Sequence, residues 1–339
     1  MTGRGKKQGG PGATRAAPRG GRAAPGGRRG PFVVVGLGEL LWDLLPDGKK
    51  PGGAPANFAY HARALGDEGL PVSRIGADPL GDQMRAAMQR LELPSRYVQV
   101  DPRQPTGTVR VQLDAGGVPT FTITPDVAWD GLEWDAALAE LAARTDAVCF
   151  GSLAQRSPGS RATIRAFLAG TRPGALRVFD VNLRQSWWSP EVLRESLGRA
   201  SIAKLNETEL PVALEALDIH VPDLHVRDLQ VQGLPAGGLA EGCRALREAF
   251  GLTLVCLTLG AEGSLLCTAS ETLRSPGVKV EVADTVGAGD GFTAVLCHHW
   301  LRGASLARTA EAANRYGAWV ASQVGPTPSV PADVADEVR

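Results

Sequence analysis

The chain has 339 residues, no net formal charge and a hydrophobic content of 43%, which is enough apolar material for a sizeable buried core. No stretch approaches the roughly 18 apolar residues of a membrane span, so a membrane protein is not expected. The five cysteines are scattered and none has the spacing of a metal site, which favours free thiols in a reducing cytoplasm.

Residues 1–31 differ in composition from the rest, with eight Lys or Arg residues, no acid and many Gly and Pro residues. Such a segment cannot bury enough apolar surface to offset the conformational entropy of ordering it, so we expect a disordered tail. Two roles are open for it: a solvated extension, or weak binding of a polyanion through its charge. No specific nucleic-acid site is predicted.

From residue 32 onward, short apolar runs alternate with segments of helical spacing. In chain order, the pattern predicts a strand at 32–36, a helix at 57–66, a hairpin at 107–125, a helix at 137–144, a strand at 147–152, a helix at 158–170, strands at 176–182 and 202–206 with a helix between them, a helix at 240–250, strands at 252–260, 263–270 and 278–282, and helices at 287–303 and 306–323. This alternation predicts an α/β fold, in which a mostly parallel sheet carries helices on both faces. The hairpin breaks the rhythm and is expected to form a separate flap, and 217–238 has little periodicity and is expected to be a surface insertion.

The stretch "DTVGAGDGF", residues 284–292, leads from an alternating segment through glycines into a helix. Backbone N–H groups at such a helix start favour an anion, so the acid Asp290 is out of place unless the ligand is a phosphoryl group in transfer. The N–H groups of Gly287, Ala288 and Gly289 would then stabilise the phosphoryl oxygens, while Asp290 takes a proton from the attacking hydroxyl. The alternative is an Asp that caps a helix after a Gly-rich turn. A P-loop sequence is absent, and no GxGxxG follows the first predicted strand.

Five motifs occur in one order along residues 32–335: "GGAPANFAYHARALG", "FDVNLRQSWW", "KLNETEL", "LTLGAEGSLL" and "DTVGAGDGF". This set resembles the PfkB/ribokinase family of sugar kinases, and the first two motifs have the form found in fructokinases. The resemblance implies a ribokinase-like three-layer α/β/α fold with a mostly parallel central sheet and a small β-sheet lid. The kinase domain would span 32–339, with lid segments at about 39–48 and 96–126.

The resemblance also implies the roles of individual residues. On the acceptor side, Asp43, Gly53 and Asn57 would bind sugar hydroxyls, and Arg184 would balance phosphate charge or contact the substrate. A structural alternative remains open for each of these residues. Gly53 could simply form a turn and Asn57 a helix cap. Asp43 could lie on an exposed strand face, and Arg184 could form a surface salt bridge.

On the nucleotide side, the resemblance implies an ATP site built from Asn206, Glu209, Thr258, Gly260, Gly263 and Asn314. Glu209 would organise Mg²⁺ through water, and the glycines would leave room for the ribose or the base. A helix cap remains open for Asn206 and Glu209, and a solvated side chain for Asn314. A monovalent cation such as K⁺ would lie near Asp284, the Val286 carbonyl and Gly325. At least one of His298 and His299 is expected to pack or to cap, and neither is expected to act as base or metal ligand.

The function expected from these motifs is an ATP-dependent sugar kinase that transfers the γ-phosphate of Mg-ATP, with fructose as the first choice of acceptor. Ribose, 2-keto-3-deoxygluconate and a nucleoside are the alternatives, and a nucleoside would need stacking on Phe121 or Trp129. Outside this class, a non-catalytic sugar- or nucleotide-binding protein and a polyanion-binding protein remain open. The apolar alternation of Phe121 and Ile123 is compatible with a homodimer formed through the lid.

Overall fold

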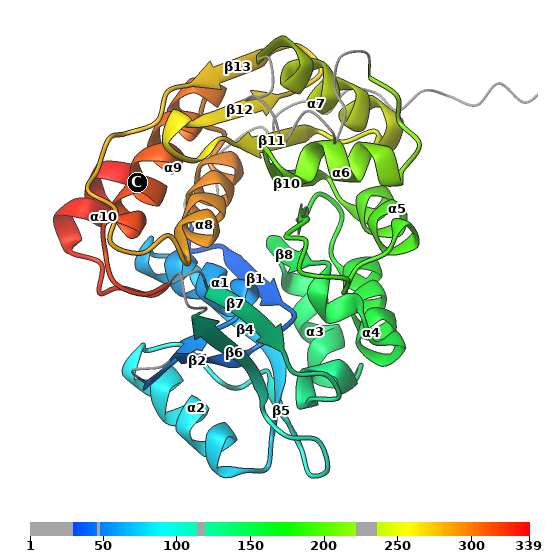
Figure 1. Cartoon of the computed structure of the whole chain (residues 1–339), viewed down its shortest axis with the longest axis vertical. Helices are drawn as coiled ribbons and strands as arrows, with labels where there is room; N and C mark the ends of the chain where they lie inside the picture. Colours follow the sequence, from blue (N-terminus) through cyan, green and yellow to red (C-terminus); the bar gives the residue numbers. More distant parts are fainter. Residues whose placement is uncertain (1–29, 46–47, 114–118, 222–235) are drawn as a thin grey trace, which may run out of the picture.

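The structure is a computed structural model that describes residues 30–45, 48–113, 119–221 and 236–339 (Figure 1). Residues 1–29 of the predicted N-terminal tail and most of the predicted insertion at 217–238 therefore lie outside the described residues. Among the residues that are described, no helix is both long and apolar enough to cross a bilayer.

A nine-stranded sheet forms the centre of the molecule, in the order β13-β12-β11-β10-β9-β8-β1-β4-β5. Its strands are β1 (Val33–Leu37), β4 (Glu68–Gly76), β5 (Val98–Asp101), β8 (Ala147–Gly151), β9 (Leu176–Asp180), β10 (Ile202–Asn206), β11 (Leu254–Thr258), β12 (Ser264–Cys267) and β13 (Thr272–Ser275). The strands from β5 to β11 pair in parallel, whereas β12 and β13 add two antiparallel strands at one edge. The predicted mostly parallel sheet is therefore present.

Helices cover both faces of this sheet, as the alternation of side chains along β1 requires. Val34 packs in the core beneath α1 (Ala54–Ala64), α8 (Ala288–Leu301), α9 (Leu306–Ala321) and α10 (Ala332–Val338). Val33 and Val35 belong to the opposite core, beneath α3 (Ala136–Arg144), α4 (Pro158–Gly170), α5 (Pro190–Arg199), α6 (Glu209–Ala216) and α7 (Ala236–Phe250). Strands with both faces buried read as continuous apolar runs, which is why the sequence located them. The predicted three-layer α/β/α arrangement is confirmed, and Figure 1 shows the two groups of helices on either side of the sheet.

A second sheet of four strands, in the order β3-β2-β6-β7, is formed by β2 (Leu41–Leu45), β3 (Gly48–Gly52), β6 (Gly107–Leu113) and β7 (Pro119–Ile123). It packs on the main core through Leu41, Val109 and Ile123, and the adjoining helix α2 (Pro79–Arg90) lies against β2 and β4. The predicted hairpin is confirmed as β6 and β7. The predicted lid range of 96–126 begins too early, because β5 pairs with β4 in the large sheet. The side chain of Phe121, which the predicted homodimer contact needs, is outside the described residues.

The strand predicted at 278–282 does not form, although its valines alternate with charged residues. The edge strand β13 ends at Ser275, and Val278, Val280 and Val282 are 40%, 37% and 61% exposed. Pro276 follows directly and has no N–H to donate to a ladder. The carbonyl groups of Ser275 and Pro276 accept hydrogen bonds from Nδ2 of Asn314 on α9, at 3.3 and 3.2 Å. The chain is thereby drawn toward α9 instead of continuing along the sheet.

Candidate active site

Several polar side chains lie at the carboxyl ends of the parallel strands, where ligands bind in open α/β sheets. Asp180, Asn206 and Thr258 are the last residues of β9, β10 and β11, and Glu39 follows β1 by two residues. Their proximity follows from the parallel pairing, because strands that run in one direction end at the same edge.

Asp290 lies in the first turn of α8, which starts directly after the glycine-rich stretch. Gly287 caps this helix with a left-handed φ of 84°, and a Cβ at that position would lie 2.6 Å from the Cα of Pro326. Both the conformation and the contact require glycine there. Burial raises the pKa of Asp290 to about 6, and the carboxylate of Asp180 adds to the effect. Asp290 therefore titrates close to neutral pH, as a general base needs.

Asn57, on the first turn of α1, is buried and donates from Nδ2 to Oδ2 of Asp290 at 2.9 Å. This bond joins the starts of α1 and α8 and favours the ionised form of Asp290. The structure thus brings together a residue predicted to bind sugar and the residue predicted to be the base. The amide contacts Asp290 instead of simply capping a helix.

A lysine and an aspartate form a buried ion pair behind Asp290. Lys204 of β10 lies opposite Asp180 of β9 in the ladder, and its Nζ is 3.2 and 3.1 Å from the two carboxylate oxygens. Burial works against the charged ammonium, but Asp180, Glu209 and Asp290 outweigh it and raise the pKa of Lys204. A Cβ on Gly289 would lie 3.1 Å from the same Nζ. A buried ammonium group therefore lies next to the backbone predicted to hold the phosphoryl group.

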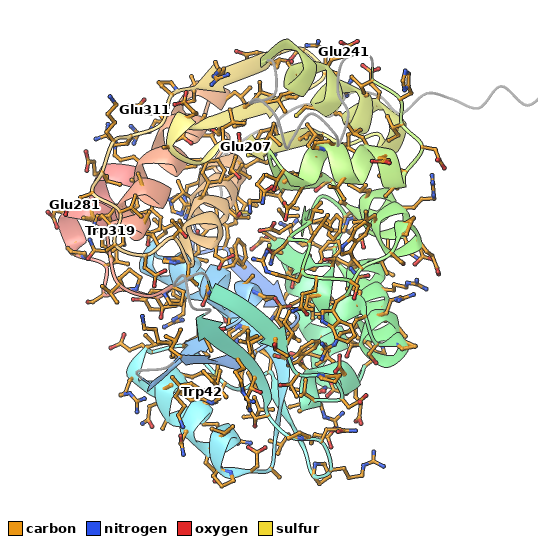
Figure 2. All side chains as sticks on the ribbon, in the orientation of Figure 1. Trp42, Glu207, Glu241, Glu281, Glu311 and Trp319 are labelled. Atoms are coloured by element: carbon orange, nitrogen blue, oxygen red, sulfur yellow. The ribbon has the colours of Figure 1, made fainter. Side chains whose placement is uncertain are left out.

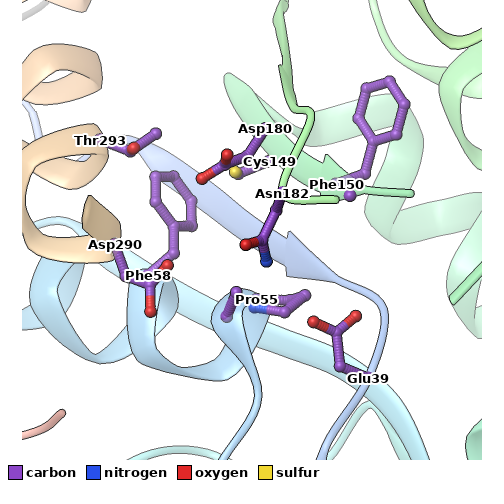
Figure 3. Close-up of a pocket in the computed structure, with 11 residues that line it drawn as sticks. Glu39, Pro55, Phe58, Cys149, Phe150, Asp180, Asn182, Asp290 and Thr293 are labelled. Carbon is purple, nitrogen blue, oxygen red and sulfur yellow. The ribbon is translucent and has the colours of Figure 1, made fainter. Parts of the chain in front are cut away.

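Glu39 lines a small cavity that Pro55, Asp180, Asn182 and Asp290 also border (Figure 3). Its side chain is 3% exposed, and its Oε2 has no hydrogen-bond partner among the described residues. Burial raises the pKa of this carboxyl to about 7, opposed by hydrogen bonds from the backbone and reinforced by the charge of Asp290. Figure 3 shows the carboxylate pointing toward the space beneath Asn182.

The other residues predicted for the acceptor side are not among those that line this cavity, although the charge of Arg184 acts on Glu39 and Asp290, which do line it. Asp43 lies on β2, where burial raises its pKa to about 6 against the opposing charges of Arg184 and Lys50. Gly53 caps α1, and a Cβ there would lie 2.4 Å from the carbonyl oxygen of Glu39. The guanidinium of Arg184 is exposed, and its charge acts on Glu39, Asp43 and Asp290. Arg184 is therefore placed to meet an anion or a polar substrate at this site.

Asn206 and Glu209 form a capping box at the start of α6, which was the alternative to a phosphate role. The Oδ1 of Asn206 accepts from the N–H of Glu209 at 2.8 Å, and Oε2 of Glu209 accepts from the N–H of Asn206 at 2.9 Å. The other oxygen of Glu209 accepts from the N–H of Leu183 at 2.9 Å. Burial raises the pKa of Glu209, partly offset by Lys204.

This arrangement fits Mg²⁺ only through water. Both carboxylate oxygens of Glu209 already bind a backbone N–H, although each keeps a lone pair for a water molecule. Across the described ranges, no cluster of three His, Cys, Asp or Glu side chains could form a protein cage for a metal ion. Mg²⁺ commonly keeps several waters and binds with substrate phosphates, so these residues are compatible with it.

The residues predicted to line the nucleotide make different local contacts, which explain why each residue type occurs at its position. Thr258 ends β11 and donates from Oγ1 to the carbonyl of Leu205 at 3.3 Å. Gly260 has a left-handed φ of 53° and open space where a Cβ would be. At Gly263, a Cβ would lie 2.2 Å from the carbonyl oxygen of Ser275, so this glycine serves backbone packing and not room for the ribose. The buried Asn314 holds that same segment, so its predicted solvated alternative is wrong.

Asp284 ties together the two segments of the predicted cation site. Its Oδ1 accepts from the N–H of Val286 at 3.0 Å, and its Oδ2 accepts from the N–H of Gly325 at 3.1 Å. The Nζ of Lys50, on β3, lies 3.8 Å from the same Oδ2. A lysine cation from the small sheet thus already contributes positive charge at this position.

Two further expectations concern ring side chains. His298 contacts Asp67 at 2.8 Å, and His299 contacts the carbonyl of Val338 at 2.7 Å, so both are buried and structural, as expected. Trp129 is 1% exposed and lies under the guanidinium of Arg156, which is 4.0 Å from the ring centroid. This tryptophan therefore cannot stack on a nucleoside base.

Sequence reasoning missed three residues of this site: Glu39, Asp180 and Lys204. Each carries a signal in the sequence, because an ionisable side chain stands within or beside an otherwise apolar strand. What the sequence did not supply is the register that places Lys204 opposite Asp180.

Comparison with known proteins shows which family the sequence matches. A family model described as pfkB family carbohydrate kinase matches residues 47–333. A fructokinase from Klebsiella pneumoniae is 34% identical over 272 residues, which cover 77% of this chain and 81% of that protein.

Solved structures agree as well. A fructokinase double mutant from Vibrio cholerae O395, bound to fructose, ADP and a potassium ion, is 25% identical with a TM-score of 0.73, covering 91% of this chain and 98% of that one. A sugar kinase from Pyrococcus horikoshii in complex with ATP is 27% identical with a TM-score of 0.72, covering 91% and 100%. These likenesses confirm the predicted ribokinase-like fold.

Proposed function

The chain belongs to the pfkB family of carbohydrate kinases and is a sugar phosphotransferase, and from this premise we propose that it transfers the γ-phosphoryl group of ATP to fructose. One observation carries the chemistry: a carboxylate with a pKa of about 6 stands in the first turn of α8, beside the N–H groups of its glycine-rich start. The fructokinases among the similar proteins support fructose as the acceptor.

In the proposed reaction, Asp290 takes the proton of the acceptor hydroxyl as the oxygen attacks the γ-phosphorus in line. A new O–P bond forms, the bond from phosphorus to the bridging oxygen of ATP breaks, and ADP leaves with the electron pair. The N–H groups of residues 287–289 stabilise the three peripheral oxygens. Lys204 adds a buried positive charge behind Gly289, and Asp180 fixes its position.

The remaining residues position the two substrates. Asp43, Gly53, Asn57 and Arg184 bind the acceptor, while Asn206, Thr258, Gly260, Gly263 and Asn314 form or support the ATP site. Mg²⁺ neutralises phosphate charge when it is bound with the nucleotide, and Glu209 would reach it through water. A monovalent cation such as K⁺ near Asp284, the Val286 carbonyl and Gly325 would have to share the Asp284 carboxylate with Lys50, whose Nζ lies 3.8 Å from Oδ2. The small sheet acts as a lid that excludes water, which would otherwise compete as phosphoryl acceptor.

A screen of ADP release tests the proposal. The wild-type protein is assayed with Mg-ATP and fructose, ribose, 2-keto-3-deoxygluconate, adenosine or fructose phosphates, and the Asp290→Asn variant serves as the blank. We expect the highest kcat/KM with fructose and stoichiometric formation of a fructose phosphate. A higher kcat/KM with another acceptor would overturn the assignment of fructose as the acceptor. Release of ADP without a phosphorylated product would overturn the proposed kinase reaction.

A further inference from the structure

One polar atom in the cavity has no partner. Oε2 of Glu39 accepts no hydrogen bond from any described residue, although the side chain is only 3% exposed. A buried polar atom without a partner costs free energy, and a charged one costs more. Such an atom in a well-packed protein calls for a partner that is absent from the protein alone.

The rest of the side chain is fixed, so the free oxygen has a defined direction. The backbone N–H groups of Glu39 and Ala54 lower the pKa of the carboxyl group, so both lie close to it. Ala54 is the first residue of α1, so the negative charge also faces the positive end of that helix. Pro55 closes one side of the cavity, and Figure 3 shows the carboxylate directed into the space between Pro55 and Asn182.

The same cavity is bordered by Asp290. A sugar bound with one hydroxyl at Asp290 has its other hydroxyls a few ångströms away, within the reach of a neighbouring side chain. Metal ions are poor candidates for the partner of Glu39, because in the described part of the chain no three acidic or other ligating side chains converge. An anion is disfavoured as the direct partner of Glu39, because the carboxyl group would repel it and Asp180 and Asp290 line the same cavity.

We propose that Glu39 is a specificity-determining residue of the acceptor site, and that its Oε2 accepts a hydrogen bond from an acceptor hydroxyl other than the one that is phosphorylated. This inference rests on the proposed sugar kinase function. It assigns Glu39 to recognition and Asp290 to proton transfer.

The charge state of Glu39 sets the conditions for a test. Burial raises its pKa to about 7, with Asp290 raising it further and Arg184 opposing the shift, while Asp180 and Lys204 complete the charged surroundings. At pH 8 most of the carboxyl is ionised, and Oε2 is an acceptor only. Assays at pH 8 therefore measure one hydrogen-bonding form.

Two variants separate recognition from structure. Glu39→Gln keeps the shape: its oxygen stays with the N–H of Ala54, and an NH₂ donor replaces the acceptor in the cavity. Glu39→Ala removes the group. Glu241→Gln is the matched control, because Glu241 is exposed on α7 and lies at the opposite end of the molecule from Trp42 of β2 (Figure 2). Thermal unfolding of each variant shows whether the fold is retained.

The decisive measurement is kcat/KM for fructose and for the set of monodeoxyfructoses, with KM for ATP measured in parallel. We expect both Glu39 variants to lose about ten- to a hundredfold in kcat/KM for fructose, mainly through KM, with KM for ATP within about twofold of wild type. One deoxyfructose, which lacks the hydroxyl that Glu39 binds, should react equally well with wild type and variants. The loss of the hydroxyl and the substitution of Glu39 would then have non-additive effects on kcat/KM, and such non-additivity identifies a direct contact between the two groups.

The outcomes divide cleanly. An equal loss on every acceptor, or a parallel loss in KM for ATP, would show a structural role and overturn the inference, as would unchanged kinetics in both variants. If wild type prefers another sugar, the proposed acceptor fails and the same comparison with that sugar's deoxy analogues still decides the role of Glu39. A wild-type protein that phosphorylates no acceptor contradicts both proposals.

Discussion

Nδ2 of Asn57 donates a hydrogen bond to Oδ2 of Asp290 at 2.9 Å, although the two residues are 233 positions apart in the chain. The bond stabilises the ionised carboxylate, whereas burial and the charge of Asp180 destabilise it. The pKa of about 6 is the balance of these effects, and it leaves the base mostly deprotonated at neutral pH.

Replacing the base should abolish turnover and leave nucleotide binding intact. Asp290→Asn keeps the shape and can accept the hydrogen bond from Asn57, but it cannot take a proton at neutral pH. We expect kcat to fall by about 10²- to 10⁴-fold, with the affinity for ATP within about threefold of wild type. ADP release and equilibrium ATP binding measure the two quantities. The exposed Asp333→Asn is the control, and turnover near the wild-type rate in Asp290→Asn would refute the assignment.

The pH dependence of kcat/KM should carry the titration of Asp290. Activity should fall about tenfold per pH unit below about pH 6, because protonated Asp290 cannot act as base. Asn57→Ala removes a hydrogen bond that lowers the pKa of Asp290, so in this variant kcat/KM should begin to fall at a higher pH. The fall in kcat/KM at low pH should persist in Glu39→Gln. This result would exclude the titration of Glu39 as the cause of the fall. A profile that is flat down to pH 5 would contradict the role of Asp290.

The same shift predicts an effect on stability. The pKa of Asp290 is about 6 in the folded protein and near 3.8 when unfolded, so the folded state binds the proton more tightly and loses stability as the pH rises from about 4 to 6. Asp290→Asn should therefore raise the free energy of unfolding at pH 8 by up to about 3 kcal/mol, and this gain should shrink below pH 6. Denaturant unfolding at pH 8 and pH 5 measures it. An equal gain at both pH values would point to packing and not to charge.

Gly287 and Gly303 provide a matched pair of substitutions. Both have a left-handed backbone, with φ of 84° and 70°, but a Cβ meets Pro326 only at Gly287 and open space at Gly303. Gly303→Ala should cost about 1–2 kcal/mol from strain alone. Gly287→Ala should cost at least about 1 kcal/mol more and should also lower kcat, since the start of α8 must move. Urea unfolding and ADP release provide the comparison; equal effects would mean that Pro326 yields without cost.

Lys204→Met tests the buried ion pair. The variant leaves Asp180 without its cation and should lose about 3–5 kcal/mol of stability. Adding Asp180→Asn should restore most of that stability, because no unpaired charge remains. Turnover should stay at least about a hundredfold below wild type in the double variant, since the charge behind Gly289 is still missing. If the double variant recovered both stability and turnover, the ion pair of Lys204 and Asp180 would have only a structural role.

The sequence located most of the fold because its strands are short, apolar and buried on both faces, as in β1 and β8. It was wrong at 278–282, where a correct alternation of valines is overruled by Pro276 and by the hydrogen bonds of Asn314. An alternating pattern predicts a strand only where a neighbour supplies the ladder.

For the site, local motifs sufficed where a single segment carries the chemistry, as at residues 287–290. They did not suffice for Lys204, whose partner Asp180 depends on the register of two strands, or for Glu39, whose free oxygen depends on α1. The N-x-x-E motif shows the same limit: the capping box is visible in the sequence, whereas a phosphate contact depends on a ligand.

The contact between α1 and α8 also bears on how the protein becomes active during synthesis. Asn57 leaves the ribosome early, but Asp290 and the helix that presents it come from the last fifth of the chain. Non-local pairing of this kind must wait for the intervening strands, and it slows folding. A nascent chain released before α8 would contain every strand of the small and the large sheet, yet it would have no base. Catalytic competence should therefore appear in a single late step, and no shorter N-terminal fragment should show partial activity.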